Sequence, residues 1–256
     1  MAAFLTALQF LTRIRLGSQI EWLPQTIGRS LLFFPIVGCL TGLIYAAVAL
    51  ATSGWMPPHI RGTVIVFAWI FVTGGLFCDG FMDTADGVFS GRSRERMLEI
   101  MKDSRVGSNG VIAFVLLALA KWSLIVDMPE VLLLPALFIM PILSRLAVVV
   151  IIRMFPSARM EGLGFIFASN AGSWSIPGAM VFTLLCSSPL LFCPVQAALW
   201  IAVAASIVAL LLAVIAGRYL SQTLGGLTGD TYGAIAEISE IAVLATFAFS
   251  IRFVLL

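Results

Sequence analysis

Long apolar segments, separated by short polar connections, constrain this 256-residue chain more than any other feature of its sequence. A transmembrane helix needs about 20 consecutive, mostly apolar residues. Apolar residues make up 61% of the chain and charged residues 11%, whereas soluble domains carry about 25% charged residues. A soluble fold of this length has too little interior to bury so much apolar surface. The sequence therefore predicts an all-α, polytopic membrane helical bundle of about seven transmembrane helices, over residues 30–52, 63–78, 110–126, 131–152, 175–191, 195–216 and 234–256.

The segments between the spans indicate one domain with a defined orientation. Residues 2–14 are apolar but too short to cross a bilayer, so we expect a short helix at the membrane interface. No internal repeat or low-complexity linker divides the chain, which predicts a single integral-membrane domain over residues 1–256. Lys and Arg concentrate in cytoplasmic loops. A cytoplasmic N-terminus leaves only Arg61 and Arg252 on the opposite side, with Lys121 and Arg145 inside spans, so we expect that orientation.

The net charge, the histidine content and the cysteine content narrow the classes of function. A net charge of +2 is too small to indicate a nucleic-acid partner. The single histidine, His59, lies in a predicted loop, so neither imidazole catalysis nor a histidine-based zinc site is expected. Cys186 and Cys193 flank one short predicted loop. They are either small buried apolar side chains or a disulfide, if that loop faces an oxidising compartment.

Three aspartates follow directly on the second apolar segment. Asp79, Asp83 and Asp86 are spaced i, i+4 and i+7, which places them on one face of a helix. Crowded carboxylates repel one another unless a cation neutralises them. Mg²⁺ takes oxygen ligands and commonly uses a few carboxylates together with substrate phosphates. The pattern therefore favours a magnesium site over a solvated acidic face, because unpaired charge beside an apolar span is costly.

A segment of alternating charge comes next. Glu95, Glu99 and Asp103 form a second acidic stripe, and arginines interrupt it. One interpretation is an amphipathic surface helix held by ion pairs. The other is that the arginines bind phosphate oxygens while the acids hold metal, which is the equipment of phosphoryl transfer. The arginines concerned are Arg92, Arg94 and Arg105.

Two further polar segments carry residues that would complete such a site. The first contains Glu161 within residues 159–164, and the second contains Asp230 within a glycine-rich stretch at residues 225–234. Glu237 and Glu240 follow early in the last span, and acids at such a depth are functional candidates. Arg145 lies inside the fourth span and needs a partner, so we expect it to face these acids.

Several motifs follow one another along nearly the whole chain. The most specific begins with the three aspartates and continues through the arginine-rich block to Gly107; it is preceded by motifs at residues 11–14 and 34–38 and followed by those at 161–164 and 225–237. In this order and spacing the chain resembles the cobalamin synthase family, whose activity is that of an adenosylcobinamide-GDP ribazoletransferase. Family members often carry His-Leu before the first aspartate, where this chain has Phe77 and Cys78.

The resemblance implies a phosphoryl transfer in the last steps of vitamin B12 nucleotide-loop assembly. A ribose hydroxyl of α-ribazole, or of its 5′-phosphate, would attack the corrinoid-side phosphorus of adenosylcobinamide-GDP, and GMP would leave. The implied partners are the corrinoid nucleotide, the α-ribazole substrate and membrane lipid, with no nucleic acid and with homo-oligomer formation left open. The implied location is the bacterial inner membrane, with several spans and an active site facing the cytoplasm.

The residues and the resemblance together predict a role for each candidate side chain. Mg²⁺ is expected to bind Asp79, Asp83 and Asp86. One carboxylate of the catalytic set would take the proton of the attacking hydroxyl, since no histidine is available. That set is Asp79, Asp83, Asp86, Asp103 and Glu237. The residues expected to bind substrate are Arg92, Arg94, Arg105, Arg145, Asp230 and Glu161.

Two other classes of function share part of this pattern. A CDP-alcohol phosphotransferase would use a similar run of aspartates to make a phospholipid, but the Ala-Arg and the later Asp-x-x-x-Asp of that family's motif are missing here. A transporter would use Glu237 and Glu240 to relay protons. Transporters, however, tend to have paired repeats and midplane sites, whereas these acids gather at one end of the spans.

Overall fold

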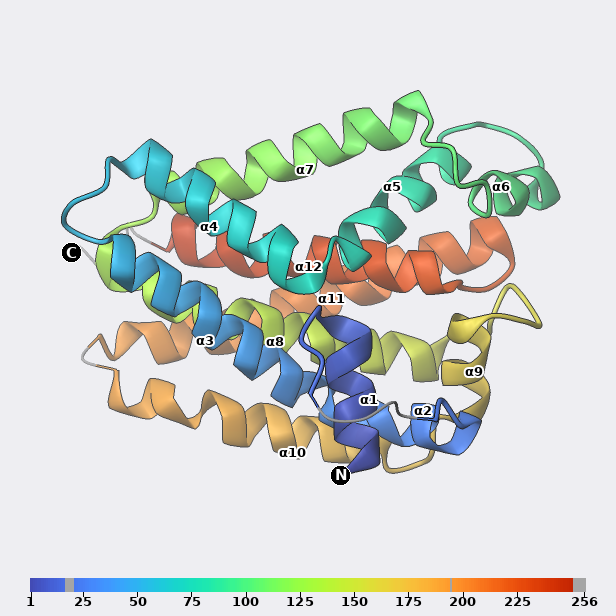
Figure 1. The fold of residues 1–256 in the computed structure, drawn as a ribbon, viewed down its shortest axis with the longest axis horizontal. Helices are drawn as coiled ribbons and strands as arrows, with labels where there is room; N and C mark the ends of the chain where they lie inside the picture. Colours follow the sequence, from blue (N-terminus) through green and yellow to red (C-terminus); the bar gives the residue numbers. More distant parts are fainter. Residues whose placement is uncertain (17–20, 194, 251–256) are drawn as a thin grey trace.

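The computed structural model describes residues 1–16, 21–193 and 195–250 as a bundle of helices, which confirms the predicted fold class (Figure 1). Within these ranges the one extended pairing is a parallel bridge between Ser157 and Leu227. The helices in chain order are α1 (Ala2–Leu11), α2 (Pro24–Ser30), η1 (Leu31–Phe33), α3 (Phe34–Thr52), α4 (Pro58–Thr73), α5 (Leu76–Val88), α6 (Arg94–Ile100), α7 (Ser108–Asp127), α8 (Glu130–Met154), α9 (Leu163–Asn170), α10 (Ser175–Ser187), η2 (Ser188–Phe192), α11 (Ala197–Leu224) and α12 (Gly229–Phe249).

Six of these elements are long and apolar enough to cross a membrane, as far as the described residues go. They are the continuous helix made by α2, η1 and α3, then α7, α8, α10 with η2, α11 and α12. The bent pair α4 and α5 becomes a seventh if it is counted as one broken span. The chain is therefore a multi-pass membrane protein, as predicted.

The predicted span over residues 63–78 is wrong in its form, because two helices share that stretch. α4 ends at Thr73, α5 begins at Leu76, and their axes are bent by 89°. Gly74 and Gly75 separate them with φ angles of 69° and 77°. Residues with a Cβ atom rarely adopt such angles. The acidic segment is consequently carried by a helix of its own rather than by the end of a straight span.

The last two long helices extend beyond the predicted apolar segments at the turn that joins them. α11 continues to Leu224 instead of ending at residue 216, and α12 begins at Gly229 instead of residue 234. These extensions contain polar as well as apolar side chains, so a search for continuous apolar segments does not include them. The predicted last span reaches residue 256, and residues 251–256 lie outside the described part of the chain.

α8 lies at the centre of the bundle, and 94% of its most apolar stretch is buried. It packs closely against α3, because Gly38 and Gly42 bring the two backbones together. A Cβ atom on Gly42 would lie 2.2 Å from the carbonyl oxygen of Phe138. Small residues at helix contacts allow such close packing in membranes, where no hydrophobic force draws helices together.

The connections at the two ends of the bundle differ in character. At one end, on the right of Figure 1, lie α6, α9 and the turn between α11 and α12; we call this the charged end. The opposite end holds the α3–α4, α7–α8 and α10–α11 connections (Figure 1), with an ion pair between Arg61 and Glu130.

Cys186 and Cys193 are free thiols, so the disulfide alternative is not realised.

Candidate active site

The first two aspartates of α5 lie beside Asp230 at the start of α12, because two glycines let these helices touch. A Cβ atom on Gly80 would lie 2.7 Å from the carbonyl oxygen of Asp230, and Gly233 faces the backbone of Gly80 in return. Asp83 lies close enough to Asp79, Asp230 and Asp86 for the charges to repel one another. The structure thus brings together carboxylates that are about 150 residues apart in the sequence.

Asp86, the third aspartate of the predicted metal site, has a different environment. Its two carboxylate oxygens accept hydrogen bonds from the backbone N–H groups of Gly107 and Gly110, each at 2.8 Å. Both glycines lie at the start of α7, where backbone N–H groups lack partners within the helix. A Cβ atom on either glycine would lie within 2.4 Å of this carboxylate. Asp86 therefore anchors the N-terminus of α7.

The charged residues of α6 and of the loop after it make both local pairs and contacts with distant segments. Arg94 packs its guanidinium group against Gly225, the C-terminal cap of α11, where a cation is favourable. Arg105 binds Asp103 at 2.6 Å, and these hydrogen bonds lower the pKa of Asp103 to about 2. Arg92 is exposed on the loop before α6. Within α6, Arg96 binds Glu99 at 2.7 Å, as expected for a surface helix held by ion pairs. In the described part of the chain, no ion pair joins Arg92, Arg94 or Arg105 to the aspartates of α5.

Glu161 links the charged loops of the chain. It accepts a hydrogen bond from Lys102 at 2.6 Å, and this bond lowers the pKa of the Glu161 carboxyl. The contact joins the loop after α6 to the loop before α9. Glu161 also lines a cavity that includes Asp79 and Asp230, so it is one of the predicted substrate-binding residues that the structure places at the site.

Arg159 connects the start of α12 with α6. Its guanidinium group donates to the Asp230 carboxylate at 3.1 Å and to the carbonyl oxygen of Leu98 at 3.0 Å. The segment that carries it is fixed by the parallel bridge, in which Leu227 donates to Pro156 and accepts from Ala158. Arg159 was not among the predicted substrate-binding residues, although its position two residues before Glu161 was a usable signal.

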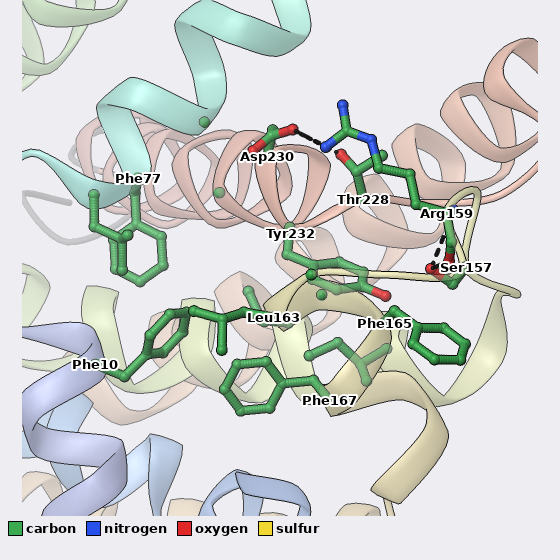
Figure 2. Close-up of a pocket in the computed structure, with 18 of the residues that line it drawn as sticks. Phe10, Phe77, Ser157, Arg159, Leu163, Phe165, Phe167, Thr228, Asp230 and Tyr232 are labelled. Atoms are coloured by element: carbon green, nitrogen blue, oxygen red, sulfur yellow. Dashed lines mark hydrogen bonds and ion pairs between the residues drawn. The ribbon is translucent and has the colours of Figure 1, made fainter. Parts of the chain in front are cut away.

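A cavity of about 270 Å³ lies among α1, α5, α8, α9 and α12. One side of its lining is aromatic and the other is polar, as Figure 2 shows. The aromatic side chains include Phe10, Phe34, Phe77, Phe167 and Tyr232. The polar ones include Asp79, Ser157, Arg159, Glu161, Thr228 and Asp230. No periodicity distinguishes these aromatic residues from ordinary core residues, so their convergence is visible only in the structure.

A second, more open cavity of about 650 Å³ adjoins the first. Its lining includes Arg13, Gly74, Met82 and Phe114. Of the described carboxylates, Asp79 alone lines both cavities. A group bound at Asp79 can therefore be approached from two directions, as a transfer between two substrates requires.

Two helix N-termini meet at the smaller cavity. α9 begins after Gly162 and α12 begins after Thr228, and residues of both first turns line the cavity. Gly164 and Gly229 allow this contact, since a Cβ atom on Gly164 would lie 2.5 Å from the backbone nitrogen of Gly229. Backbone N–H groups and helix dipoles make such termini favourable positions for phosphate.

The acids deeper in α12 lie in a buried ion-pair network. Lys121 binds Glu237 and Glu240 at 2.5 Å each, and Arg145 binds Glu240. The expectation that Arg145 faces these acids is confirmed. Both Glu237 and Arg145 are 0% exposed and line neither cavity. Arg145 lies over the ring of Phe77, 4.3 Å from its centroid, so it supports the cavity wall rather than reaching the cavity.

The carboxylates at the cavities could supply only some of the ligands that a metal ion needs. Among the residues that the structure describes, no three His, Cys, Asp or Glu side chains are grouped so that they could hold a metal ion by themselves. Asp86 already uses both oxygens for backbone N–H groups. Asp79 and Asp83 are hard oxygen donors of the kind Mg²⁺ prefers, and Mg²⁺ commonly completes its coordination with substrate phosphates.

Known proteins resemble this chain over almost its full length. Residues 3–248 match the family model described as Cobalamin-5-phosphate synthase. The chain is 38% identical over 244 residues to the adenosylcobinamide-GDP ribazoletransferase of Roseiflexus sp. (strain RS-1), covering 95% of this chain and 88% of that protein. It is 34% identical over 242 residues to the protein of the same name from Thermoanaerobacter pseudethanolicus, covering 94% of each. No solved structure matches the chain.

Proposed function

The chain belongs to the cobalamin-5-phosphate synthase family, and from this premise we propose that it catalyses the reaction for which its curated relatives are named. A ribose hydroxyl oxygen of α-ribazole, or of its 5′-phosphate, forms a bond to the corrinoid-side phosphorus of adenosylcobinamide-GDP. The bond from that phosphorus to the bridging oxygen breaks, and GMP leaves with the bridging oxygen. The single observation that carries the proposal is that Asp79 lies where two cavities meet, beside Asp83 and Asp230.

Arg159 and two helix N-termini are the groups around the smaller cavity that can donate hydrogen bonds to the oxygens of a pyrophosphate. Arg159 already lies against Asp230, 3.1 Å away, and the N-termini of α9 and α12 line the same cavity. Phosphoryl transfer is catalysed mainly by positioning and by neutralising charge that develops on the phosphate oxygens. We assign phosphate binding to these groups.

Asp79 is the carboxylate best placed to take the proton of the attacking hydroxyl. It lines both cavities, whereas Asp230 and Glu161 line only the smaller one. A general base must lie within hydrogen-bonding reach of the proton that it removes. A hydroxyl entering from one cavity and a phosphate entering from the other would meet at this side chain.

We propose that Mg²⁺ binds to Asp83, to one carboxylate oxygen of Asp79 and to the substrate phosphates, which leaves the second oxygen of Asp79 to take the hydroxyl proton. When bound, the ion would neutralise charge on the transferred phosphate and on the leaving GMP. The mutual repulsion of Asp79, Asp83 and Asp230 supports this assignment, since crowded carboxylates favour a cation. Asp86 is left out of the metal site in this proposal, because its oxygens hold the N-terminus of α7.

We propose that the charged end faces the cytoplasm of a bacterial cell and that the spans cross the inner membrane. The Lys and Arg residues of the α5–α7 and α8–α9 connections lie at this end, while the opposite end carries Arg61. Cytoplasmic loops are enriched in Lys and Arg. Nucleotide-activated substrates would then reach the site directly.

Product analysis of the purified protein tests the proposed reaction. Incubation with adenosylcobinamide-GDP, α-ribazole and Mg²⁺ is expected to release GMP and to form the corrinoid product in equal amounts. A parallel incubation with a CDP-activated lipid and an alcohol acceptor is expected to give no CMP. Turnover of the lipid substrate without any GMP release would overturn the proposal in favour of a phospholipid phosphotransferase.

A further inference from the structure

The smaller cavity has the size and the lining of a site for one flat aromatic base. We infer that its aromatic side receives the base of the nucleoside substrate and points the ribose toward Asp79. The corrin end of the other substrate then stays at the larger cavity, with its pyrophosphate at the polar side of the smaller one, beside Arg159. The inference rests on the proposed function for the identity of the nucleoside. The chemistry that it assigns to the cavity, binding of a planar heteroaromatic ring, rests on the lining alone.

The volumes of the two cavities separate the substrates. Pockets for drug-sized ligands begin at about 300 Å³, so the smaller cavity, of about 270 Å³, admits a two-ring base and excludes a corrin macrocycle. The larger cavity, of about 650 Å³, is open on one side. It can therefore admit the end of a substrate whose remainder stays outside.

In the aromatic wall Phe10 is partly exposed, and the rings that support it, Phe34 and Phe167, are 1% and 2% exposed. Phe167 lies at the centre of the wall, with its ring centroid 5.0 Å from that of Phe10 and 5.7 Å from that of Phe34. Phe77 and Tyr232 complete it (Figure 2). Stacked bases gain affinity from aromatic side chains irrespective of base identity, because every base has a π-face.

One buried polar group in the wall has no partner. Tyr232 is 5% exposed, and its hydroxyl has no hydrogen-bond partner among the described residues. Buried polar atoms are almost always hydrogen-bonded, and an exception needs an explanation. A nucleoside acceptor, either a ring nitrogen or a ribose oxygen, would supply the missing partner. This observation is independent of the cavity volume and of the aromatic stacking.

Asp79 fixes the direction in which the nucleoside must lie. It lines the smaller cavity together with the aromatic residues, and it is also part of the larger one. A base held against Phe10 leaves its ribose as the part that extends toward the second cavity. The hydroxyl would then lie at the carboxylate that we assign as its base.

The test uses Tyr232→Phe, which removes only the unpartnered hydroxyl, and Phe10→Leu, which removes the partly exposed ring while keeping an apolar side chain. Loss of one hydrogen bond should raise the KM for α-ribazole about 2- to 10-fold, and loss of one stacking surface about 5-fold or more. The KM for adenosylcobinamide-GDP should stay within about 2-fold. The matched control is Tyr219→Phe on the exposed face of α11, which should change neither KM.

Equilibrium dialysis of α-ribazole alone against the purified protein separates this inference from the proposed reaction. Weaker α-ribazole binding by Tyr232→Phe and Phe10→Leu, with Tyr219→Phe unchanged, supports the cavity as the nucleoside site even if GMP release is not seen. Normal α-ribazole binding and KM in both folded cavity variants would overturn it while leaving the reaction standing. A rise in the KM for adenosylcobinamide-GDP alone would also overturn it, by assigning the cavity to the other substrate.

Discussion

Replacing Lys121 with methionine perturbs the buried ion-pair network of α7, α8 and α12 at its centre. The Lys121 ammonium group contacts two carboxylates at 2.5 Å each, and it lies 3.6 Å from the centroid of the Trp69 ring. With Arg145, Glu237 and Glu240 the network contains two cations and two anions, so its net charge is zero. Methionine keeps most of the side-chain volume and removes one positive charge, which leaves one carboxylate without compensation.

The expected cost follows from the burial of these groups. Their side chains are at most 2% exposed, so water cannot solvate the remaining charge. Removing one partner of a buried ion pair costs about 3 to 5 kcal/mol. The double variant Lys121→Met/Glu237→Gln restores a net charge of zero, and it should recover more than half of the loss. The matched control, Lys102→Met, breaks an exposed pair with Glu161 and should change stability little.

Unfolding in mixed micelles measures these differences. The protein would be titrated with a denaturing detergent while helix content and tryptophan fluorescence are recorded, and the free energy of unfolding compared among the four proteins. Lys121→Met should be the least stable, and the double variant should lie between it and the parent. The electrostatic reasoning would be refuted if Lys121→Met were as stable as the parent, or if the second substitution added a further loss.

Three more substitutions test the geometry of the charged end. Asp86→Asn should destabilise the protein by about 1 to 3 kcal/mol, because the amide group cannot accept both backbone N–H bonds; a normal melting temperature in detergent would contradict this role. Gly80→Ala should lower kcat and stability together, since the new methyl group would lie 2.7 Å from the Asp230 carbonyl oxygen, and equal activity to the parent would count against the tight α5–α12 contact. Arg159→Gln should reduce kcat/KM for adenosylcobinamide-GDP at least about 10-fold, as steady-state GMP release would show; an unchanged value would remove Arg159 from phosphate binding.

The sequence predicts most of the fold because the bilayer simplifies the problem. Each long apolar stretch must become a helix, since lipid offers no partner for backbone polar groups. The break at Gly74 and Gly75 was harder to predict, although the pair of glycines was a visible signal. The apolar content of the sequence hardly changes at these two glycines. Only their positive φ angles show that α5 leaves the direction of α4.

The candidate site was predictable where neighbouring residues share one helix. Asp79 and Asp83 lie on α5 and gather with Asp230 as their spacing and the glycine-rich turn indicated. Asp86 also lies near Asp83, as the helical spacing predicts, but its two oxygens accept hydrogen bonds from the backbone of Gly107 and Gly110. Contacts to backbone in another segment leave no pattern in a single sequence, which explains why this difference appears only in the structure.

The roles predicted for Glu237 and Arg145 also depend on contacts between segments that are distant in the sequence. An acid inside a span is a functional candidate because unpaired charge is costly there. The sequence contained Lys121 as well, but its pairing with Glu237 depends on how α7 packs against α12. A buried, neutralised network and a reactive acid look alike until that packing is known.

The rate of GMP release across Mg²⁺ concentrations, compared among single carboxylate variants, tests the proposed chemistry most directly. Asp79→Asn and Asp83→Asn should release no GMP at any Mg²⁺ concentration while remaining folded and membrane-inserted. Glu99→Gln, on the exposed face of α6, should match the parent, and chelation of Mg²⁺ should stop the parent reversibly. Near-normal turnover by Asp79→Asn or Asp83→Asn, or full activity of the parent without divalent metal, would contradict a magnesium-dependent transfer centred on these two aspartates.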